Sequence, residues 1–381
     1  MSEGKSETRP DIGKFVGFDH VVFYVGNAKQ AASYYTTRFS FEYFAYRGLE
    51  TGEREVACHV VKKNNVLFEF RSSYDPEDKN GIGKSVQVHG DGVADIAFAV
   101  EDLEKTFGIA KERGAKVVRE IQKHEDEDGY VLTAALQTYG DTVHTLIQRN
   151  NYKGLFFPGY KAHPLKEPFN EVLEPAELEV IDHIVANHKV GDMEATAQWY
   201  EKYLSFHRFW SVDETIIHTE YSALNSIVMA DYDENIKMPQ NEPANGKKRS
   251  QIQEYVDYYN GSGVQHIAIR TNDILRDIER LRKRGVEFLS VPDAYYESMR
   301  KRIPDMKVPI KEDIDLLQKN KILIDYDDKG YLLQIFTKPV EDRPTLFFEI
   351  IQRNNHQGFG AGNFKSLFKA IEDEQAKRGN L

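Results

Sequence analysis

The residues best placed to do chemistry are two histidines and a glutamate, each inside a separate apolar segment. Glu349 lies in the middle of a segment of aromatic and aliphatic residues, where a carboxylate is costly to bury unless it is paired or bound to a metal. His183 and His266 lie in two further aliphatic segments. Two imidazoles and one carboxylate form the facial triad of non-haem Fe(II) oxygenases, which leaves three metal positions open. A lone histidine at a strand start is more often structural, so the hypothesis depends on all three residues together.

The chain repeats itself, and the repeat selects these residues among the 12 histidines of the sequence. Four anchor segments of the second half match four of the first half in the same order, which indicates a tandem duplication. In each half, β-branched and aromatic strand patterns surround helical patterns, and this order predicts an α+β fold with two βαβββ modules per half. The matched segments are 179–185 with 17–22, 198–206 with 33–41, 263–269 with 92–98, and 349–355 with 145–151.

The first half has different residues at the positions of the triad. His20, Asp95 and Thr145 stand at the three equivalent positions. The triad carboxylate is therefore replaced by a hydroxyl, and we expect no such metal site in this half. His20 is then expected to be a structural histidine, and only the second half is expected to be catalytic.

Aromatic and amide side chains share the strand faces of the predicted triad. Phe347 lies two residues before Glu349, and because strand side chains alternate with period 2 both point to one face. Gln334 and Phe336 repeat this spacing in an earlier strand segment. We expect the two phenylalanines to be able to enclose a phenol, although each is equally well explained as a core aromatic residue.

A glycine-rich segment at 357–363 follows the last strand and opens a helical pattern. An apolar stripe on a helix most often serves packing, but a helix that lies across an open barrel can also control access to the barrel. We therefore predict a lid helix at about 363–377 that does both. Its apolar residues recur at i, i+3, i+4 and i+7, namely Phe364, Leu367, Phe368 and Ile371.

Composition excludes several classes of function. A net charge of −11 argues against binding nucleic acid or anionic membranes through an overall field. The single cysteine, Cys58, excludes an intramolecular disulfide and fits a reducing compartment. We find no apolar run of signal-peptide or membrane-spanning length. We therefore expect a cytoplasmic protein that neither inserts into membranes nor binds nucleic acid.

Prolines mark the expected domain boundary. Four of them fall between the two halves, where they favour an extended path over the surface. We predict an N-terminal domain without a metal site at 1–160, a linker at 161–179 and a C-terminal catalytic domain at 180–381. A further irregular stretch with two prolines, 231–250, is expected to be a loop.

Several motifs go beyond what a shared fold requires. They are Gly48-Leu-Glu-Thr-Gly-Glu-Arg54, Tyr255-Val-Asp-Tyr258, Gly263–Ala268, Asp325–Phe336 and Gln357–Phe364. Together they resemble the 4-hydroxyphenylpyruvate dioxygenase family, in its animal form, within the vicinal oxygen chelate superfamily. The resemblance covers nearly the whole chain. It implies tandem vicinal oxygen chelate domains, in which four βαβββ modules form two open barrel-like halves followed by a C-terminal helix.

The resemblance also implies a cofactor and a reaction. His183, His266 and Glu349 would bind one Fe(II) per chain, with O2 as co-substrate. The substrate would be a small aromatic 2-oxo acid that supplies its own keto acid, so 2-oxoglutarate, haem and flavin are not expected. In tyrosine catabolism, this family converts 4-hydroxyphenylpyruvate to homogentisate and CO2 by oxidative decarboxylation, ring hydroxylation and side-chain migration.

Family positions that carry the reaction match residue by residue. Gln265 adjoins His266 and would point to the opposite face of an ideal strand, so its role rests on the resemblance alone. The implied catalytic set is Gln265, Gln334, Phe336, Phe347, Asn363 and Phe364, and the implied substrate-binding set is Ser226, Asn241, Gln251 and Phe359.

Other functions remain open on the sequence alone. The 4-hydroxymandelate synthases share substrate and triad but oxidise the benzylic carbon, whereas Pro239, Asn241 and Phe336 resemble the ring-hydroxylating branch. Ring cleavage of catechols would suit the tandem plan, and a non-catalytic binding protein of the same fold is a further alternative, against which the intact triad argues. Animal members of the family tend to be dimers, so we expect a homodimer through the N-terminal domain.

Overall fold

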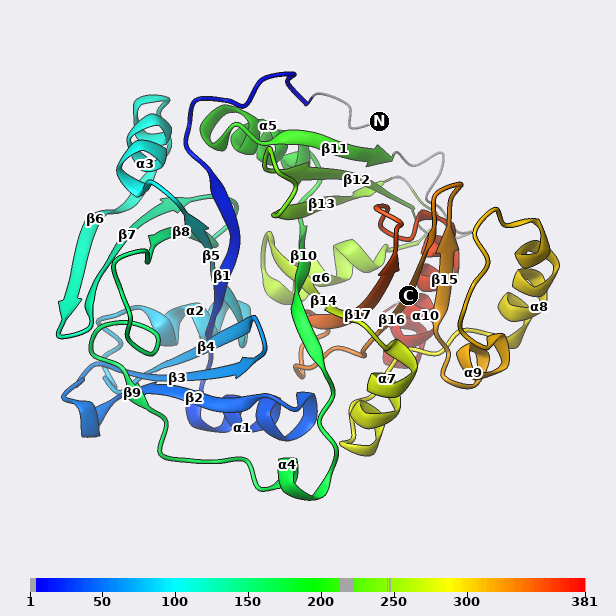
Figure 1. Ribbon diagram of the computed structural model, residues 1–381, viewed down its shortest axis with the longest axis horizontal. Coiled ribbons are helices and arrows are strands. Elements are labelled where there is room, and N and C mark those ends of the chain that lie inside the picture. The colour runs from blue at the N-terminus through cyan, green and yellow to red at the C-terminus, as the bar shows by residue number, and fades with distance from the viewer. Residues whose placement is uncertain (1–4, 213–222, 245, 247, 381) are drawn as a thin grey trace.

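The fold consists of two sheets, one from each half of the sequence, each curled into a half-barrel. A computed structural model describes residues 5–212, 223–244, 246 and 248–380. Within them the first sheet has nine strands and the second has eight, and the two half-barrels lie side by side (Figure 1). The predicted α+β fold with tandem open half-barrels is confirmed.

The first sheet has the strand order β6-β7-β8-β5-β1-β4-β3-β2-β9. Antiparallel pairing of β1 with β5 joins its two modules at the centre of the sheet. Its strands are β1 (Phe15–Tyr24), β2 (Glu42–Arg47), β3 (Val56–Lys63), β4 (Val66–Ser73), β5 (Gly92–Val100), β6 (Val117–Asp126), β7 (Gly129–Gln137), β8 (Val143–Gln148) and β9 (Lys161–Ala162). Its helices are α1 (Ala28–Phe39), η1 (Leu49–Thr51), α2 (Ile82–His89) and α3 (Leu103–Glu112).

The second sheet has the order β11-β12-β13-β10-β14-β17-β16-β15, with the same antiparallel pairing at its centre, between β10 and β14. Its strands are β10 (Leu178–Asn187), β11 (His207–Val212), β12 (Ala223–Ala230), β13 (Lys237–Ala244), β14 (Gly263–Thr271), β15 (Leu323–Tyr326), β16 (Tyr331–Phe336) and β17 (Phe347–Asn354). Helix α4 (Phe169–Val172) lies in the connection between the two halves. The helices of the second half are α5 (Asp192–Leu204), α6 (Gln251–Tyr259), α7 (Ile274–Lys283), α8 (Asp293–Arg302), η2 (Ile303–Asp305), α9 (Ile314–Lys319), η3 (Ala361–Asn363) and α10 (Phe364–Arg378).

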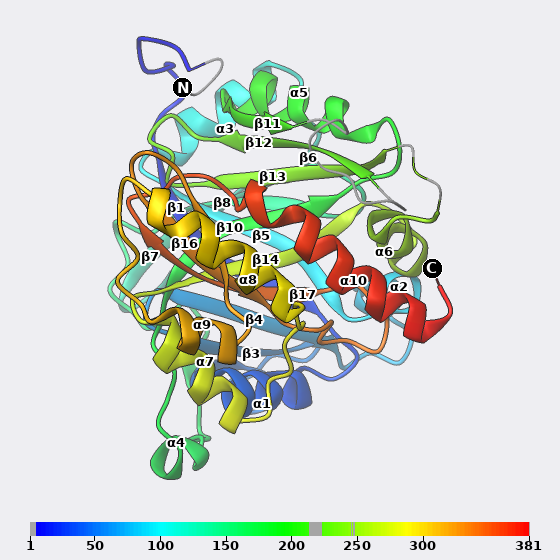
Figure 2. The same cartoon turned by 90° about the vertical axis from the view of Figure 1, so that its right-hand side faces the viewer.

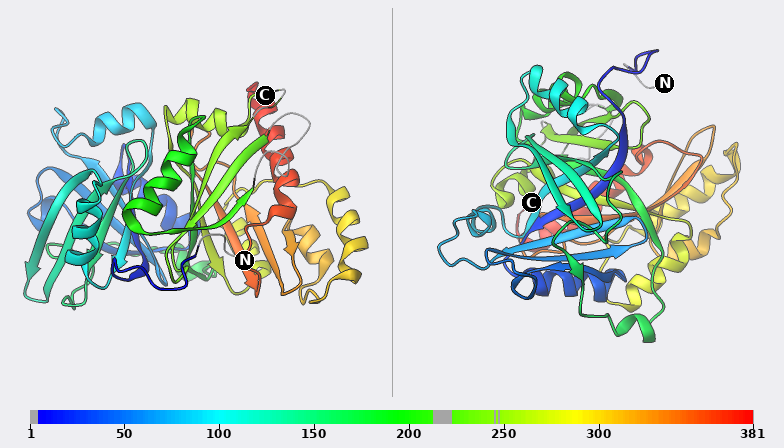
Figure 3. Two further views of the ribbon diagram at one scale, coloured as in Figure 1. Left: turned by 90° about the horizontal axis from the view of Figure 1, so that it is seen from above. Right: turned by 60° about the vertical axis from the view of Figure 1, so that its left-hand side comes forward.

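Each half packs a helix against a strand of the other half. Tyr35 of α1 contacts Phe348 of β17, with ring centroids 5.6 Å apart. At the equivalent place, the Tyr200 hydroxyl of α5 lies 2.7 Å from His144 Nε2 of β8. These contacts belong to one core of buried side chains that both halves share. Because the helix-covered faces of the sheets are used in this packing (Figure 3), the concave faces remain available for binding.

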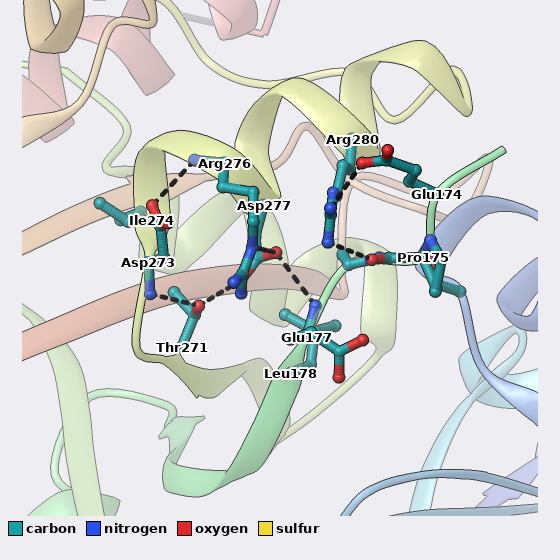
Figure 4. Close-up of polar contacts among 12 residues, drawn as sticks. Glu174, Pro175, Glu177, Leu178, Thr271, Asp273, Ile274, Arg276, Asp277 and Arg280 are labelled. Carbon is teal, nitrogen blue, oxygen red and sulfur yellow. Dashed lines mark hydrogen bonds and ion pairs between the residues drawn. The ribbon is translucent and has the colours of Figure 1, made fainter.

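The connection between the halves is anchored by α7 (Figure 4). Arg280 donates to the Pro175 carbonyl at 2.9 Å and to the Glu174 carboxylate at 2.5 Å. The fully buried Asp277 accepts from the backbone N–H of Glu177 at 3.0 Å and from the Arg276 side chain at 2.9 Å. The residues just before β10 are therefore fixed by α7, which sets where this strand begins.

The stretch at 231–250, expected to be a loop, contains β13 instead. Its prolines argued against a strand, because proline cannot donate to a ladder. The backbone groups of Pro239 and Pro243 point to the same side of β13 as those of Asn241. The Asn241 carbonyl accepts from the N–H of His188, the residue directly after β10, at 2.8 Å. The prolines therefore face β10, with which β13 pairs over only Gln240 and Asn241, and the ladder with β12 keeps its donors.

Helix α10 crosses the open side of the second half-barrel (Figure 2). Its residues Leu367, Ala370 and Ile371 pack in one buried cluster with Phe336 and Phe347 of the strands beneath. Near its C-terminal end, Arg378 forms an ion pair of 2.8 Å with Glu254 of α6. The helix therefore covers the concave face of this half and is tied to its rim.

Candidate metal centre

Three neighbouring strands, β10, β14 and β17, bring His183, His266 and Glu349 together. One ligand atom of each residue lies within 4.8 Å of the others. Glu349 Oε2 is 3.1 Å from His183 Nε2 and 3.3 Å from His266 Nε2. The strand register explains the meeting, because Ala268 of β14 pairs with His183 on one side and with Glu349 on the other. The predicted triad is thus a buried cluster with the size of a metal site.

Two β-bulges aim pairs of consecutive residues at this cluster. The pairing of β10 with β14 skips Asp182 on one strand and Gln265 on the other. Gln265 Oε1 consequently lies 2.9 Å from His266 Nδ1. The expectation that Gln265 points to the opposite face is wrong, because a bulge interrupts the strict alternation of a strand and re-aims a side chain.

An aspartate and an arginine hold the first histidine in place. Asp182 Oδ1 lies 2.8 Å from His183 Nδ1, and Arg353 donates to both oxygens of Asp182 at 2.7 and 2.8 Å. A proton on Nδ1 that is shared with the carboxylate leaves the lone pair of Nε2 directed at Glu349. Arg353 also donates to the carbonyls of His356 and Gly358 at 3.0 and 2.6 Å, which links this support to the glycine-rich segment.

The charges of the cluster suit a cation. Burial raises the pKa of Glu349, but the two imidazoles outweigh this effect and lower that pKa to about 2. Burial lowers the pKa of both histidines, and this effect prevails at His266. At His183 the carboxylates of Glu349 and Asp182 outweigh burial and raise the pKa. The carboxylate is therefore ionised and the His266 imidazole neutral at neutral pH, the forms in which these groups bind metals.

The triad also leaves one polar atom without a partner among the described residues. Glu349 Oε1 is buried and makes no hydrogen bond to the described residues. A buried, unpaired carboxylate oxygen is costly, and a cation held between the two Nε2 atoms and this carboxylate would remove the cost. The residues present therefore fit a bound metal ion.

Aromatic rings form one wall beside the triad. The Phe347 ring stacks on His266, with centroids 4.9 Å apart and an interplanar angle of 20°. Phe336 meets His266 edge-on at 5.9 Å. The two phenylalanine rings contact each other at 6.2 Å and 73°. A phenol between them therefore requires one ring to turn, and their predicted role stays a prediction.

Amide and hydroxyl side chains form the other wall. Ser226 of β12 and Asn241 of β13 are direct cross-strand partners. Gln251 of α6 accepts from Gln265 Nε2 at 3.0 Å, which extends the chain of contacts that begins at His266. Gln334 is fully buried, and neither polar atom of its amide has a partner among the described residues. An amide with both atoms unsatisfied has its full hydrogen-bonding capacity left for a bound molecule.

The glycine-rich segment lies directly against the triad. The Phe359 ring meets the His183 ring edge-on at 5.1 Å. Gly360 has a φ of 78°, and a Cβ there would lie 2.2 Å from Gln334 Nε2, so only glycine allows this approach. Asn363 accepts from the Tyr295 hydroxyl at 2.8 Å. The side chain of Phe364, also predicted to be catalytic, lies outside the residues that the structure describes.

Sequence reasoning gave no role to three residues that belong to this site. Asp182 and Arg353 support the metal ligand, and their signal was present, because both stand in segments that the first half repeats. Asn187 pairs with Asn241 in the β10–β13 register, so both side chains project from the same face. Its amide is buried without a partner among the described residues. The position of Asn187 at the end of a strand carried no sequence signal.

Comparisons with known proteins identify the family. A family model described as the Glyoxalase/Bleomycin resistance protein/Dioxygenase superfamily matches residues 17–145 and 180–335. A 4-hydroxyphenylpyruvate dioxygenase from Tetrahymena thermophila is 60% identical over 377 residues, which cover 98% of this chain and 93% of that protein. A 4-hydroxyphenylpyruvate dioxygenase from Xenopus tropicalis is 56% identical over 370 residues, which cover 97% of this chain and 94% of that protein. This chain belongs to the 4-hydroxyphenylpyruvate dioxygenase family.

A solved structure shares the fold of this 4-hydroxyphenylpyruvate dioxygenase family member. A triple mutant of 4-hydroxymandelate synthase from Streptomyces coelicolor superposes with a TM-score of 0.82 at 27% identity, covering 94% of this chain and 98% of that chain. The two segments matched by the superfamily model begin within β1 and β10, the first central strand of each half-barrel. Among the described residues, no helix is long and apolar enough to cross a lipid bilayer.

Proposed function

We propose that this chain is an Fe(II)-dependent dioxygenase that converts 4-hydroxyphenylpyruvate and O2 to homogentisate and CO2 in tyrosine catabolism. The observation that carries the proposal is the buried cluster of His183, His266 and Glu349, in which both imidazole Nε2 atoms face one carboxylate. It occurs in a chain that is 60% identical to a 4-hydroxyphenylpyruvate dioxygenase over 98% of its length.

The triad residues would hold the iron, and their supports would fix its geometry. Bound Fe(II) supplies three open coordination positions and the redox chemistry of oxygen activation. Asp182, itself held by Arg353, orients His183, and Gln265 orients His266. Such supports of a metal ligand contribute to metal affinity and activity.

The walls of the pocket would bind and orient the substrate. Phe336 and Phe347 lie beside His266 and would contact the aromatic ring once one of them turns. The phenol hydroxyl and the carboxylate would receive hydrogen bonds from the neutral polar residues of the opposite wall. Correct placement of the ring beside the metal is the main contribution that the protein makes to the rate. The polar residues proposed for substrate contact are Ser226, Asn241, Gln251, Gln265 and Gln334.

The C-terminal elements would exclude water from the reaction. Phe359 lies against His183, and Leu367 and Ile371 of α10 pack on the phenylalanine wall. Asn363 begins α10 at the point where the glycine-rich segment meets Gln334. We propose that this segment, with Asn363 and Phe364, closes over bound substrate, which keeps reactive species away from bulk water.

A second candidate is benzylic oxidation of the same substrate. It is favoured by the likeness to 4-hydroxymandelate synthase, which has a TM-score of 0.82 but only 27% identity. Oxygen uptake by protein reloaded with Fe(II), with 4-hydroxyphenylpyruvate and identification of the aromatic product, separates the two. Homogentisate supports the proposal and 4-hydroxymandelate supports the second candidate. No uptake by iron-loaded protein would contradict both, and leave a binding protein of this fold.

The proposal extends to the domain boundaries, the compartment and the oligomeric state, which the sequence and the family resemblance suggested. We propose a metal-free domain at 1–160, a linker at 161–179 and a catalytic domain at 180–381, acting in the cytoplasm as a homodimer joined through the first domain. Light scattering of the full chain tests the oligomer, since a monomer at micromolar concentration would contradict it.

A further inference from the structure

The first half-barrel contains a cavity of about 310 Å³ that the proposed reaction does not use. It lies on the concave face and is lined by His20, Asp95 and Thr145, which are the repeat equivalents of the metal triad. Its volume is at the lower end of the range of known ligand sites. The fold therefore places a second pocket, without the triad carboxylate, where the catalytic half has its active site.

The strand register shows how the lining of this pocket differs. In the first half Tyr24 pairs with Arg71, where the catalytic half pairs Asn187 with Asn241. A charged guanidinium thus replaces a neutral amide that the proposed function assigns to substrate binding. The aromatic wall is also missing.

The aromatic wall is missing because of which residues pair between the outer strands of the first half. Ala135 pairs with Thr145 in the first half, whereas Phe336 pairs with Glu349 in the second. The first cavity therefore lacks the ring that crowds the catalytic site, and a small molecule has room beside Thr145.

Two of the three arginines that line the cavity are already neutralised. Arg71 donates to both oxygens of the buried Glu69, at 2.9 and 2.8 Å, and Arg47 forms an ion pair with Glu53. These two ion pairs leave Arg71 and Arg47 with little net charge to attract a ligand. The third arginine, Arg119, is not paired in this way.

Arg119 of β6 has no acidic partner within the described residues. Its one described hydrogen bond goes to the neutral hydroxyl of Thr145, at 3.2 Å. Its Nε is buried and has no partner there. The nearby Asp95 is occupied instead by the backbone N–H of Thr145, at 2.9 Å, and by the Thr145 hydroxyl. A guanidinium with a buried, unsatisfied N–H is costly unless an anion is bound.

We propose that this cavity binds a small organic monocarboxylate, with the carboxylate on Arg119 and an apolar body against Phe157 and Tyr160. The planar fork of a guanidinium matches a carboxylate, and both aromatic residues line the cavity. A dianion such as phosphate is disfavoured, because Glu53, Glu55 and Asp95 also line it and like charges repel. The site depends neither on the metal nor on the reaction proposed above.

The test measures binding of 4-hydroxyphenylacetate, a monocarboxylate without a keto group, to the full-length, iron-loaded protein by calorimetry. Hydrogen exchange followed by mass spectrometry locates the site in the same samples. We expect protection of β6 at 117–126 and of the segment 152–160, which contributes Phe157 and Tyr160. We expect Arg119→Gln to weaken binding to this site by about ten- to a hundredfold and to abolish that protection, with Arg119→Lys in between.

The matched control is Arg54→Gln, which removes an exposed guanidinium of the same domain and is expected to leave the affinity unchanged. Equal affinity of wild type and Arg119→Gln, or protection confined to residues 223–380, would overturn the proposal. If Arg119→Gln fails to fold, the exchange pattern of the wild type and the affinity of Arg119→Lys still decide it. Oxygen uptake with 4-hydroxyphenylpyruvate is measured separately, so a failure of the proposed enzyme activity is distinguishable from a failure of this site.

Discussion

The two half-barrels share the support of a metal site, but only one of them has the ligands. In the first half, His20 Nδ1 lies 2.7 Å from Asp19 Oδ1, and Arg149 donates to both oxygens of Asp19 at 2.6 and 2.7 Å. The equivalent three residues of the second half have the same contacts. The β-bulge that turns the aspartate inward also occurs in both central strands. This buried aspartate–histidine–arginine unit therefore occurs both with and without the triad carboxylate.

The difference between the halves lies in what faces the free nitrogen of the histidine. In the first half, His20 Nε2 is 3.7 Å from Glu69 Oε2, and Glu69 is already bound by Arg71. In the second half, His183 Nε2 faces Glu349, whose second oxygen has no partner among the described residues. Both half-barrels therefore keep the support, whereas the proposed chemistry needs the two further ligands, His266 and Glu349.

Copying the first half into the triad should have the largest effect. Glu349→Thr installs the residue found at the equivalent position 145 and removes the charged ligand. We expect loss of oxygen uptake by several orders of magnitude, because two imidazoles alone bind Fe(II) weakly. Thr145→Val is the matched control and should retain uptake within about twofold. Oxygen uptake by Glu349→Thr close to that of the wild type would contradict the role of Glu349 as a metal ligand.

Weakening the support should have a smaller effect, and only in one half. Asp182→Asn removes the charge that orients His183, and loss of such a support lowers metal affinity by about 10- to 100-fold. Iron titration of the metal-stripped variant measures this change. Asp19→Asn should leave iron affinity at the wild-type value while lowering the melting temperature, because Arg149 loses its carboxylate. Equal iron affinity of Asp182→Asn and wild type would contradict the assigned support.

Removing the aromatic wall should affect the substrate rather than the metal. Phe336→Ala reproduces the residue at the equivalent position 135, and loss of one ring contact predicts a decrease of kcat/KM by about tenfold. Steady-state kinetics measure it, with iron content as a check that the triad is intact. Phe348→Leu, on the opposite face of the adjacent strand, should lower stability without this kinetic effect. A kcat/KM of Phe336→Ala equal to that of the wild type would argue for a purely structural ring.

The contact between the halves should show the smallest effect, and only at high pH. Glu341 lies in the connection between β16 and β17 of the second half, and its neighbour Asp91 lies between α2 and β5 of the first half. Burial and the neighbouring carboxylates of Asp91 and Asp342 raise the pKa of Glu341 from 4.5 to about 8. Between these values the folded protein holds a proton that the unfolded chain has lost, so stability falls as pH rises through this window. Glu341→Gln should therefore raise the melting temperature by a few degrees at pH 8.5 and by less at pH 5. Equal shifts at both pH values would refute this.

The repeat made the cluster of His183, His266 and Glu349 predictable from the sequence, because the two divergent copies showed which of the 12 histidines stand at repeated strand positions. The fold class followed from the same repeat. The face of the sheet to which a strand residue points was harder to predict. Gln265 was placed on the wrong face because a β-bulge depends on pairing with β10, which local alternation does not encode.

Long-range pairings account for the other failures. Arg353 reaches Asp182 across 171 residues of sequence, so their shared role was invisible even though both residues were repeated. The prolines of β13 suggested a loop, and only the direction of the Asn241 carbonyl explains why a strand tolerates them. In each case the missing information was which strand lies beside which.

The metal content of the full chain decides whether only the second half-barrel binds iron. Protein stripped of metal, reloaded with Fe(II) and freed of excess is analysed for iron per chain by mass spectrometry. We expect one iron per chain in wild type and in Thr145→Val, and close to none in Glu349→Thr. Two irons per chain in the wild type, or iron retained by Glu349→Thr, would contradict the claim that only the second half-barrel holds the metal.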